Sequence, residues 1–217
     1  MKSVNVLLCR SARLLAPLCL AASLGTAVIS QALAQTPPAT VRMRGTVLSV
    51  TPETLTVKDR SGEVIELAIS SKLTVSEVFP IALQDIQPGS YIGAAALPQA
   101  DGSQRAIAVS VFAESARGTG EGHRPYDLLP QSTMTNATVA DIGTMTTAAS
   151  GRTLQLKYKD GEKTLIVPAD TPIVTSRPAD RSLLVPGASV SLFAQMLEGK
   201  PTVQRINAGK NGFALPL

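Results

Sequence analysis

The chain has 217 residues, of which 44% are hydrophobic but only 3% aromatic, with no tryptophan, one histidine and two cysteines. Its formal net charge is +4 at pH 7. So few aromatic side chains do not supply the stacking surface that proteins use to bind single-stranded nucleic acid. A single histidine also limits any catalytic triad or histidine-based metal site to one position.

The N-terminal residues show the three parts of a secretory signal. Three basic residues precede an apolar run over 14–29, and Ala32-Leu33-Ala34 then places small residues where signal peptidase reads the chain. We therefore predict a signal peptide over residues 1–34, cut between Ala34 and Gln35, and a periplasmic protein. The apolar run is shorter than the roughly 20 residues of a spanning helix, so we expect no membrane span after cleavage.

Removal of this signal would change both the cysteine content and the charge. Cys9 and Cys19 lie inside it, so the exported protein would have no thiol for a disulfide, a nucleophile or a metal ligand. Three of the 20 basic residues leave and all 16 acidic residues stay, which lowers the net charge from +4 to +1 (17 − 16). A nearly neutral protein attracts polyanions weakly, so we expect no nucleic-acid partner.

After a short tail over residues 35–41, the chain alternates apolar and polar side chains. Ile65, Leu67 and Ile69, for example, alternate with Glu66, Ala68 and Ser70, which is typical of a strand with one buried face. Residues 75–86 lack this pattern and predict a short helix or an irregular loop. The strands predicted around this segment lie at 42–50, 54–59, 63–70, 90–97 and 105–113.

A second unit repeats the first. Leu55–Glu63 returns as Leu154–Glu162, an offset of 99 (161 − 62), and the turn formed by Pro88-Gly89 returns as Pro186-Gly187. Proline fixes φ and glycine permits a positive φ, so each Pro-Gly pair predicts a type II turn before a strand. The strands predicted for the second unit lie at 136–146, 153–159, 162–168, 188–196 and 201–208.

The fold predicted from these elements is all-β, with two tandem OB-like five-stranded small barrels after the cleaved signal. The first barrel would span 42–115 and the second 136–217 with a C-terminal tail, joined by a Gly/Pro-rich connecting segment over 116–135. Each half would close its own sheet, because a unit of this size cannot leave a sheet edge uncovered. A pair of small sandwiches is the alternative.

The connecting segment holds the candidate metal ligands. Glu121, His123 and Met134 offer a carboxylate, an imidazole and a thioether, and the last two suit copper. The spacing of these residues matches no specific metal motif. A copper- or zinc-handling protein is therefore an alternative function, while the primary expectation is that the protein has no cofactor.

Catalytic groupings are not evident in the sequence. No Gly-x-Ser-x-Gly motif occurs, and a serine triad would need His123 beside a serine such as Ser132. The carboxylates are scattered through predicted turns and solvent-facing positions. We therefore expect a protein that is not an enzyme.

Five stretches of the chain carry a family resemblance: Arg44-Gly45-Thr46-Val47, Leu55-Thr56-Val57-Lys58, Asp85 to Gly93, Gly120 to Asp127 and Ser132 to Ala137. In these stretches the sequence resembles uncharacterised exported proteins of Gram-negative bacteria that carry an OB-like domain of unknown function. Members are sometimes labelled metal-transporter permeases, a label that this chain contradicts because a permease needs several spanning helices. The resemblance implies that the connecting segment is a site, with His123, Arg124, Tyr126 and Asp127 as candidates for binding a ligand or partner.

The predicted signal peptide, the repeated turns and the lack of catalytic residue groupings together favour one function. We expect a non-enzymatic periplasmic binding or scaffolding protein whose ligand or partner, a protein or a small molecule, the sequence does not specify. Metal handling through His123 and Met134 is the alternative.

Overall fold

The computed structural model describes residues 39–144 and 151–217, and the described part is all-β. The predicted signal peptide over 1–34, most of the predicted tail and residues 145–146 of one predicted strand lie outside the described residues. Three single-turn 3₁₀ helices, Leu83–Asp85, Glu114–Ala116 and Arg181–Leu183, accompany the strands. The strands are β1 (Thr40–Val50), β2 (Thr54–Asp59), β3 (Val64–Pro80), β4 (Tyr91–Pro98), β5 (Gln104–Val111), β6 (Gly122–Pro125), β7 (Thr133–Thr144), β8 (Arg152–Tyr158), β9 (Gly161–Val167), β10 (Ile173–Ala179), β11 (Ser189–Leu197) and β12 (Lys200–Gly209).

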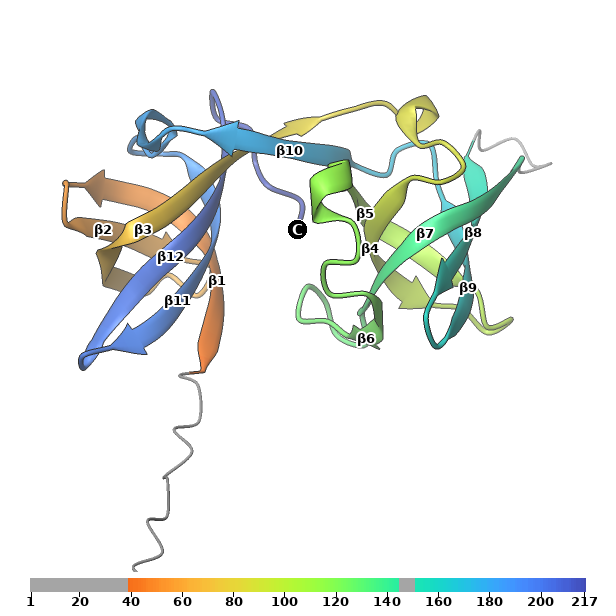
Figure 1. The fold of residues 1–217 in the computed structure, drawn as a ribbon, viewed down its shortest axis with the longest axis horizontal. Coiled ribbons are helices and arrows are strands. Elements are labelled where there is room, and N and C mark those ends of the chain that lie inside the picture. The colour runs from red at the N-terminus through yellow and green to blue at the C-terminus, as the bar shows by residue number, and fades with distance from the viewer. Residues whose placement is uncertain (1–38, 145–150) are drawn as a thin grey trace, which may run out of the picture. The chain divides into compact units, whose positions relative to one another are not determined.

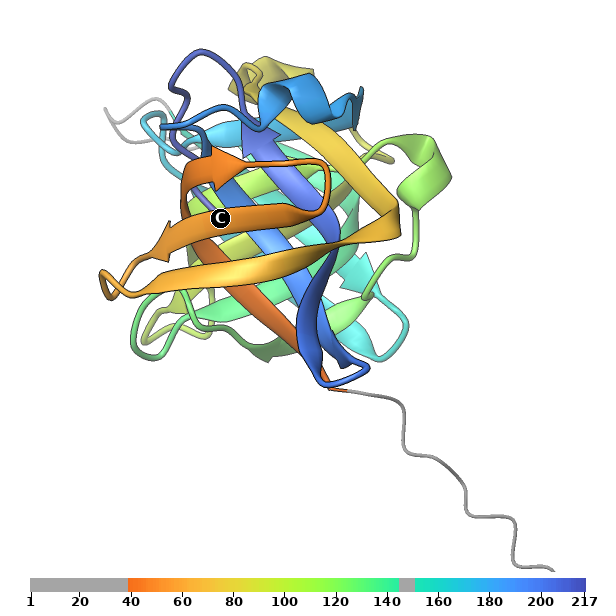
Figure 2. The same cartoon turned by 90° about the vertical axis from the view of Figure 1, so that its left-hand side faces the viewer.

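Five strands close a barrel, which Figure 2 shows facing the viewer. β1 pairs with β2 and β11, β3 pairs with β2 and β12, and β11 pairs with β12. The β3–β12 pair is parallel and the other four are antiparallel. Leu55, Val57 and Leu67 are buried inside because they occupy alternate positions of their strands. The predicted all-β class and a closed five-stranded barrel are confirmed.

The barrel takes its strands from both ends of the chain. β1, β2 and β3 belong to residues 40–80, whereas β11 and β12 belong to residues 189–209. The sequence predicted one barrel over 42–115 and another over 136–217, each with a sheet closed inside its own half. This barrel does not have those boundaries. The reason lies in residues 75–86, expected to be a short helix or loop, because β3 instead continues to Pro80 as a 17-residue strand. Such an extended strand carries the chain away from β1.

The remaining strands continue the sheet beyond the barrel. β4 pairs with β5 and β7, β8 pairs with β7 and β9, and β9 also pairs with β5 in parallel. β10 runs antiparallel to the second half of β3 and parallel to β5, so all twelve strands share one hydrogen-bonded network (Figure 1). A second buried cluster, which includes Ile92, Val109 and Leu154, lies among these strands.

The two predicted Pro-Gly turns have matching geometry. Gly89 has φ +86° and Gly187 has φ +88°, in the region that favours glycine. The backbone N–H of Ser90 donates to the Gln87 carbonyl at 2.9 Å, and that of Ala188 donates to the Val185 carbonyl at 2.9 Å. These turns precede β4 and β11, as the sequence predicts, and they orient both strands in the same way.

Candidate functional site

A cavity of about 580 Å³ lies against the outer face of the barrel. Arg42 of β1, Phe193 of β11 and Arg205 of β12 line it. Leu192 and Ala194, the chain neighbours of Phe193, point into the barrel core. Because side chains alternate along a strand, Phe193 points outward to the cavity.

The opposite wall comes from the strands outside the barrel and from the end of the described chain. Asn136 of β7 and Phe112, which follows β5, face the cavity. Val78 of β3 and Val174 of β10 add apolar surface, and Leu215 packs against both of them. The cavity therefore combines aromatic, aliphatic, amide and guanidinium groups from elements that lie far apart in the sequence.

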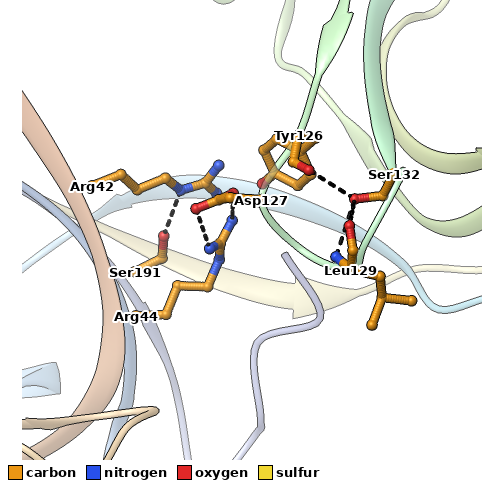
Figure 3. Close-up of polar contacts among 7 residues, drawn as sticks. All are labelled: Arg42, Arg44, Tyr126, Asp127, Leu129, Ser132 and Ser191. Atoms are coloured by element: carbon orange, nitrogen blue, oxygen red, sulfur yellow. Dashed lines mark hydrogen bonds and ion pairs between the residues drawn. The ribbon is translucent and has the colours of Figure 1, made fainter.

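A loop over residues 126–132 reaches from β6 to the barrel (Figure 3). The Ser132 hydroxyl holds this loop: its single hydrogen is shared between the Tyr126 and Leu129 carbonyls, at 2.9 and 2.7 Å, and its oxygen accepts the Leu129 N–H at 3.0 Å. Gln131 adopts a positive φ of 62° to complete the turn. The hydroxyl that a serine triad would need is thus occupied in shaping the loop.

The loop places Tyr126 and Asp127 against β1. Arg44 donates from Nη1 and Nη2 to the two Asp127 carboxylate oxygens at 2.9 and 2.8 Å, a bidentate ion pair. The guanidinium carbons of Arg42 and Arg44 lie 5.0 and 5.2 Å from the centre of the Tyr126 ring. Two stacked cations and one ion pair therefore join the connecting segment to the barrel.

The charges of this cluster respond to burial and pairing. The hydrogen bonds from Arg44 hold the pKa of Asp127 below its usual value, although burial opposes this. Burial lowers the pKa of Arg42 from its usual value. Arg42 makes only a 3.4 Å hydrogen bond to the Ser191 hydroxyl among the described residues, so its charge has no carboxylate partner there.

The connecting segment packs against β4 and β7. The Thr119 carbonyl accepts hydrogen bonds from the Tyr91 hydroxyl at 3.2 Å and from Asn136 Nδ2 at 2.9 Å. Arg117 donates to the Gly89 carbonyl at 2.9 Å, and Arg124 donates to the Gly120 carbonyl at 2.7 Å. Residues 116–135 therefore lie hydrogen-bonded against these strands and include the short strand β6.

The four predicted binding residues separate into two groups. Arg124 and Tyr126 line the cavity, whereas Asp127, the residue after Tyr126, does not line it and pairs with Arg44. His123 does not line it, because His123 and Arg124 are neighbours on β6 and point to opposite faces. The His123 Nδ1 lies 2.8 Å from the Thr135 hydroxyl on the face away from the cavity.

The candidate metal ligands are not brought together. Met134 pairs with Arg124 across the β6–β7 ladder and lines the cavity, whereas His123 pairs with Thr135 on the other face. The Glu121 carboxylate accepts the Lys159 backbone N–H at 3.0 Å. Within residues 39–144 and 151–217, no three His, Cys, Asp or Glu side chains are grouped so that they could hold a metal ion.

Sequence reasoning missed Arg42, Phe193 and Arg205. In the barrel, Phe193 lies directly opposite Arg42 on one side and Arg205 on the other. The available signal is the placement of these residues at outward positions of predicted strands, where a phenylalanine is out of pattern. A phenylalanine at an outward position indicates a binding surface only when the order of the strands in the sheet is known.

In the part of the chain that the structure describes, no helix has the length and apolar character required to span a membrane. Comparison with known proteins finds no matching family model, no similar curated protein and no similar solved structure.

Proposed function

We propose that this chain is a non-enzymatic binding or scaffolding protein of the periplasm, and that the cavity beside Arg42, Tyr126 and Phe193 is its binding site. The observation that carries this proposal is the cavity itself, with its convergent cationic, aromatic and amide side chains. Its volume of about 580 Å³ falls in the range of roughly 300–1,000 Å³ that is common for small-molecule sites.

The proposed architecture is a pair of OB-like barrels that exchange strands. β7, β8, β9, β5 and β4 pair in the same order as β1, β2, β3, β12 and β11, and each series contains one parallel pair, β5–β9 or β3–β12. The register also shifts at matching points, at Val47 of β1 and Val139 of β7. These likenesses support duplication of one unit, followed by exchange of its last two strands between the copies.

This exchange gives a physical reason for a shared site. Each barrel would receive two strands from the other copy, so that residues of both copies line the cavity. Ligand binding would then stabilise the contact between the copies, because a ligand that binds only the folded state adds to its stability.

The absence of an enzymatic role is part of this proposal. His123, the single histidine of the chain, lies beside Thr135, and the Ser132 hydroxyl is engaged within its own loop. A nucleophile needs a base within hydrogen-bonding reach. Among the described residues, the Ser132 hydroxyl and the His123 imidazole form no hydrogen bond with each other.

A cavity-blocking variant tests the proposal. Ser110 lines the cavity, so the side chain of Ser110→Trp would occupy it, whereas Ser182→Trp adds the same side chain at an exposed position outside it. We expect a ligand from periplasmic extract to remain with the wild type and with Ser182→Trp, and to be lost from Ser110→Trp. Native mass spectrometry measures this directly. Equal retention by all three proteins would contradict the use of the cavity.

Two further measurements test the rest of the proposal. N-terminal sequencing of protein from the periplasmic fraction should begin at Gln35. A panel of ester, glycoside and phosphate substrates should give no turnover. Turnover that a single substitution within residues 116–135 abolishes would show that the protein is an enzyme.

A further inference from the structure

One row of side chains across the barrel surface forms a cationic and aromatic platform. Arg42, Phe193 and Arg205 lie side by side on β1, β11 and β12. The guanidinium carbons of Arg42 and Arg205 lie 5.6 and 4.2 Å from the centre of the Phe193 ring. Stacking on a ring holds a guanidinium flat and leaves its edge N–H groups free for an oxygen acceptor.

Among the side chains that line the cavity, the only charges are positive; Leu217, which bears the α-carboxylate, also lines it. Three arginines, Arg42, Arg124 and Arg205, are among its described lining residues, which include no aspartate or glutamate. Asp127 lies nearby, but both of its carboxylate oxygens accept hydrogen bonds from Arg44. Arg42 is half-buried, whereas Arg124 and Arg205 are exposed. Withdrawing the Arg42 guanidinium from water without an opposite charge is unfavourable, and a bound anion would offset that cost.

Polar groups at the edge of the cavity also lack partners. The Tyr126 hydroxyl and Arg44 Nε are buried and have no hydrogen-bond partner among the described residues. Buried donors are nearly always satisfied in folded proteins. Tyr126 lines the cavity and Arg44 does not, so only the tyrosine belongs to the cavity wall.

The rest of the lining is apolar or neutral. Phe112, Val78, Val174 and Leu215 form apolar wall, and Asn136 adds a neutral amide. A ligand that matches this surface has a charged end for the arginines and an apolar body for the wall. The cavity volume, about 580 Å³, is in the range that is common for small-molecule sites.

We infer that the cavity binds a small organic anion, a carboxylate, sulfonate or phosphate ester, whose anionic group contacts Arg42 and Arg205 and whose aromatic or other apolar body lies against Phe193 and Phe112. This inference rests on the proposed function and adds the chemical class of the ligand.

Two fluorescent probes separate charge from apolar contact. Anilinonaphthalene sulfonate is an aromatic anion, and N-phenylnaphthylamine has the same aromatic skeleton without the sulfonate. In titrations of protein purified after expression of the full chain, we expect one saturable site for the sulfonate. Binding of the neutral probe should be weaker by about tenfold or more, since it forms no charge-assisted hydrogen bonds.

Arginine variants locate the anionic group. Arg42→Gln and Arg205→Gln should each weaken binding of the sulfonate by about tenfold, because each removes one charged donor, and should leave the neutral probe unaffected. Arg105→Gln is the matched control, because Arg105 is exposed on β5 and does not line the cavity. Partial unfolding would increase sulfonate binding, so it cannot imitate the expected loss.

Different failures have different meanings. Equal affinity for both probes, or full sulfonate affinity in both arginine variants, would overturn the anion inference while the cavity remained a binding site. If Ser110→Trp bound both probes as well as the wild type did, or if neither probe bound the wild type, the inference and the use of the cavity would both be contradicted.

Discussion

The Arg44–Asp127 ion pair joins the connecting segment to the barrel. The Arg44 side chain is only 9% exposed, whereas that of Asp127 is 60% exposed. A nearly buried guanidinium needs its carboxylate partner more than an exposed carboxylate needs the guanidinium. The pair therefore contributes to stability chiefly by compensating the nearly buried charge of the Arg44 guanidinium.

Asp127→Asn should lower the free energy of unfolding by about 1 kcal/mol. Hydrogen bonds to charged groups contribute somewhat more than this, but the exposure of Asp127 reduces the effect. Urea unfolding followed by circular dichroism measures the change. Asp170→Asn, at an exposed position with no side-chain hydrogen bond among those described, is the control and should leave stability unchanged. Equal stability of both variants would show that the pair contributes nothing.

The same pair predicts a pH dependence. The pKa of Asp127 is lower in the folded protein than in the unfolded chain, because Arg44 donates two hydrogen bonds to its carboxylate. The stabilisation is therefore complete above the unfolded pKa, about 3.9, and is lost as the pH falls through the lower folded value. We expect the stability difference between wild type and Asp127→Asn to persist at pH 7 and to shrink below about pH 4. A difference that does not depend on pH would contradict this assignment.

At the residue scale, the sequence pointed to one wall of the site and missed the other. Arg124, Tyr126 and Asp127 are consecutive or nearly so in a Gly/Pro-rich segment, where a local pattern can single them out. Arg42 and Phe193 become neighbours only through the β1–β11 register. No local pattern specifies that register, so their shared role could not be predicted.

At the scale of elements, β10 and the second half of β3 pair with each other and lie between the two sets of strands. Arg177 of β10 donates to Glu77 Oε2 on β3 from Nε and Nη2, at 3.0 and 2.8 Å, and its guanidinium lies 4.9 Å from the centre of the Phe79 ring. The Glu77 side chain is 11% exposed, so this carboxylate depends on Arg177 for compensation.

Arg177→Met should destabilise the protein by about 2 kcal/mol, because it leaves the Glu77 carboxylate buried without a charge partner; the 58% exposure of Arg177 keeps the cost below that of a fully buried pair. Adding Glu77→Gln should restore part of the loss, since an amide is less costly to bury than a charge. Chemical unfolding of both single variants and the double variant gives the coupling energy. Strictly additive effects would show that the two side chains do not interact.

Strand prediction from the sequence succeeded where alternation and turn residues agreed. It failed for the second half of β3 and for β10. Each of the ten predicted ranges overlaps a strand of the structure, although several of the strand ends differ. The continuation of β3, with β10 and β6, was not predicted because these segments bury polar side chains or contain proline, as at Glu77 and Pro178. Such residues are unusual inside strands and are tolerated here because Glu77 has Arg177 as its partner.

For the whole molecule, the long β3 decides how the chain is divided. A loop at the predicted position, residues 75–86, would let β4 return to β1 and close a barrel within the first half. The extended strand instead leads the chain away, and β11 takes the place beside β1. The sequence predicts two similar units, but it does not specify which strand closes the barrel, because β4 and β11 both follow a Pro-Gly turn.

An engineered disulfide distinguishes these two connections. Thr40 lies opposite Gln195, and in a barrel closed within the first half its partner would be Leu97, since the turn glycines set the two strands at an offset of 98 (187 − 89). Directly opposite residues of antiparallel strands have Cα atoms about 4.5–5.5 Å apart, within the range that a disulfide bridges. A chain that starts at Gln35 contains no cysteine to interfere.

The most direct measurement is therefore the oxidation of two double variants in the monomer, followed by peptide mapping. Thr40→Cys with Gln195→Cys should form the disulfide, and Thr40→Cys with Leu97→Cys should remain reduced. If the second pair oxidised and the first stayed reduced, each half would close its own barrel and the strand exchange would be contradicted.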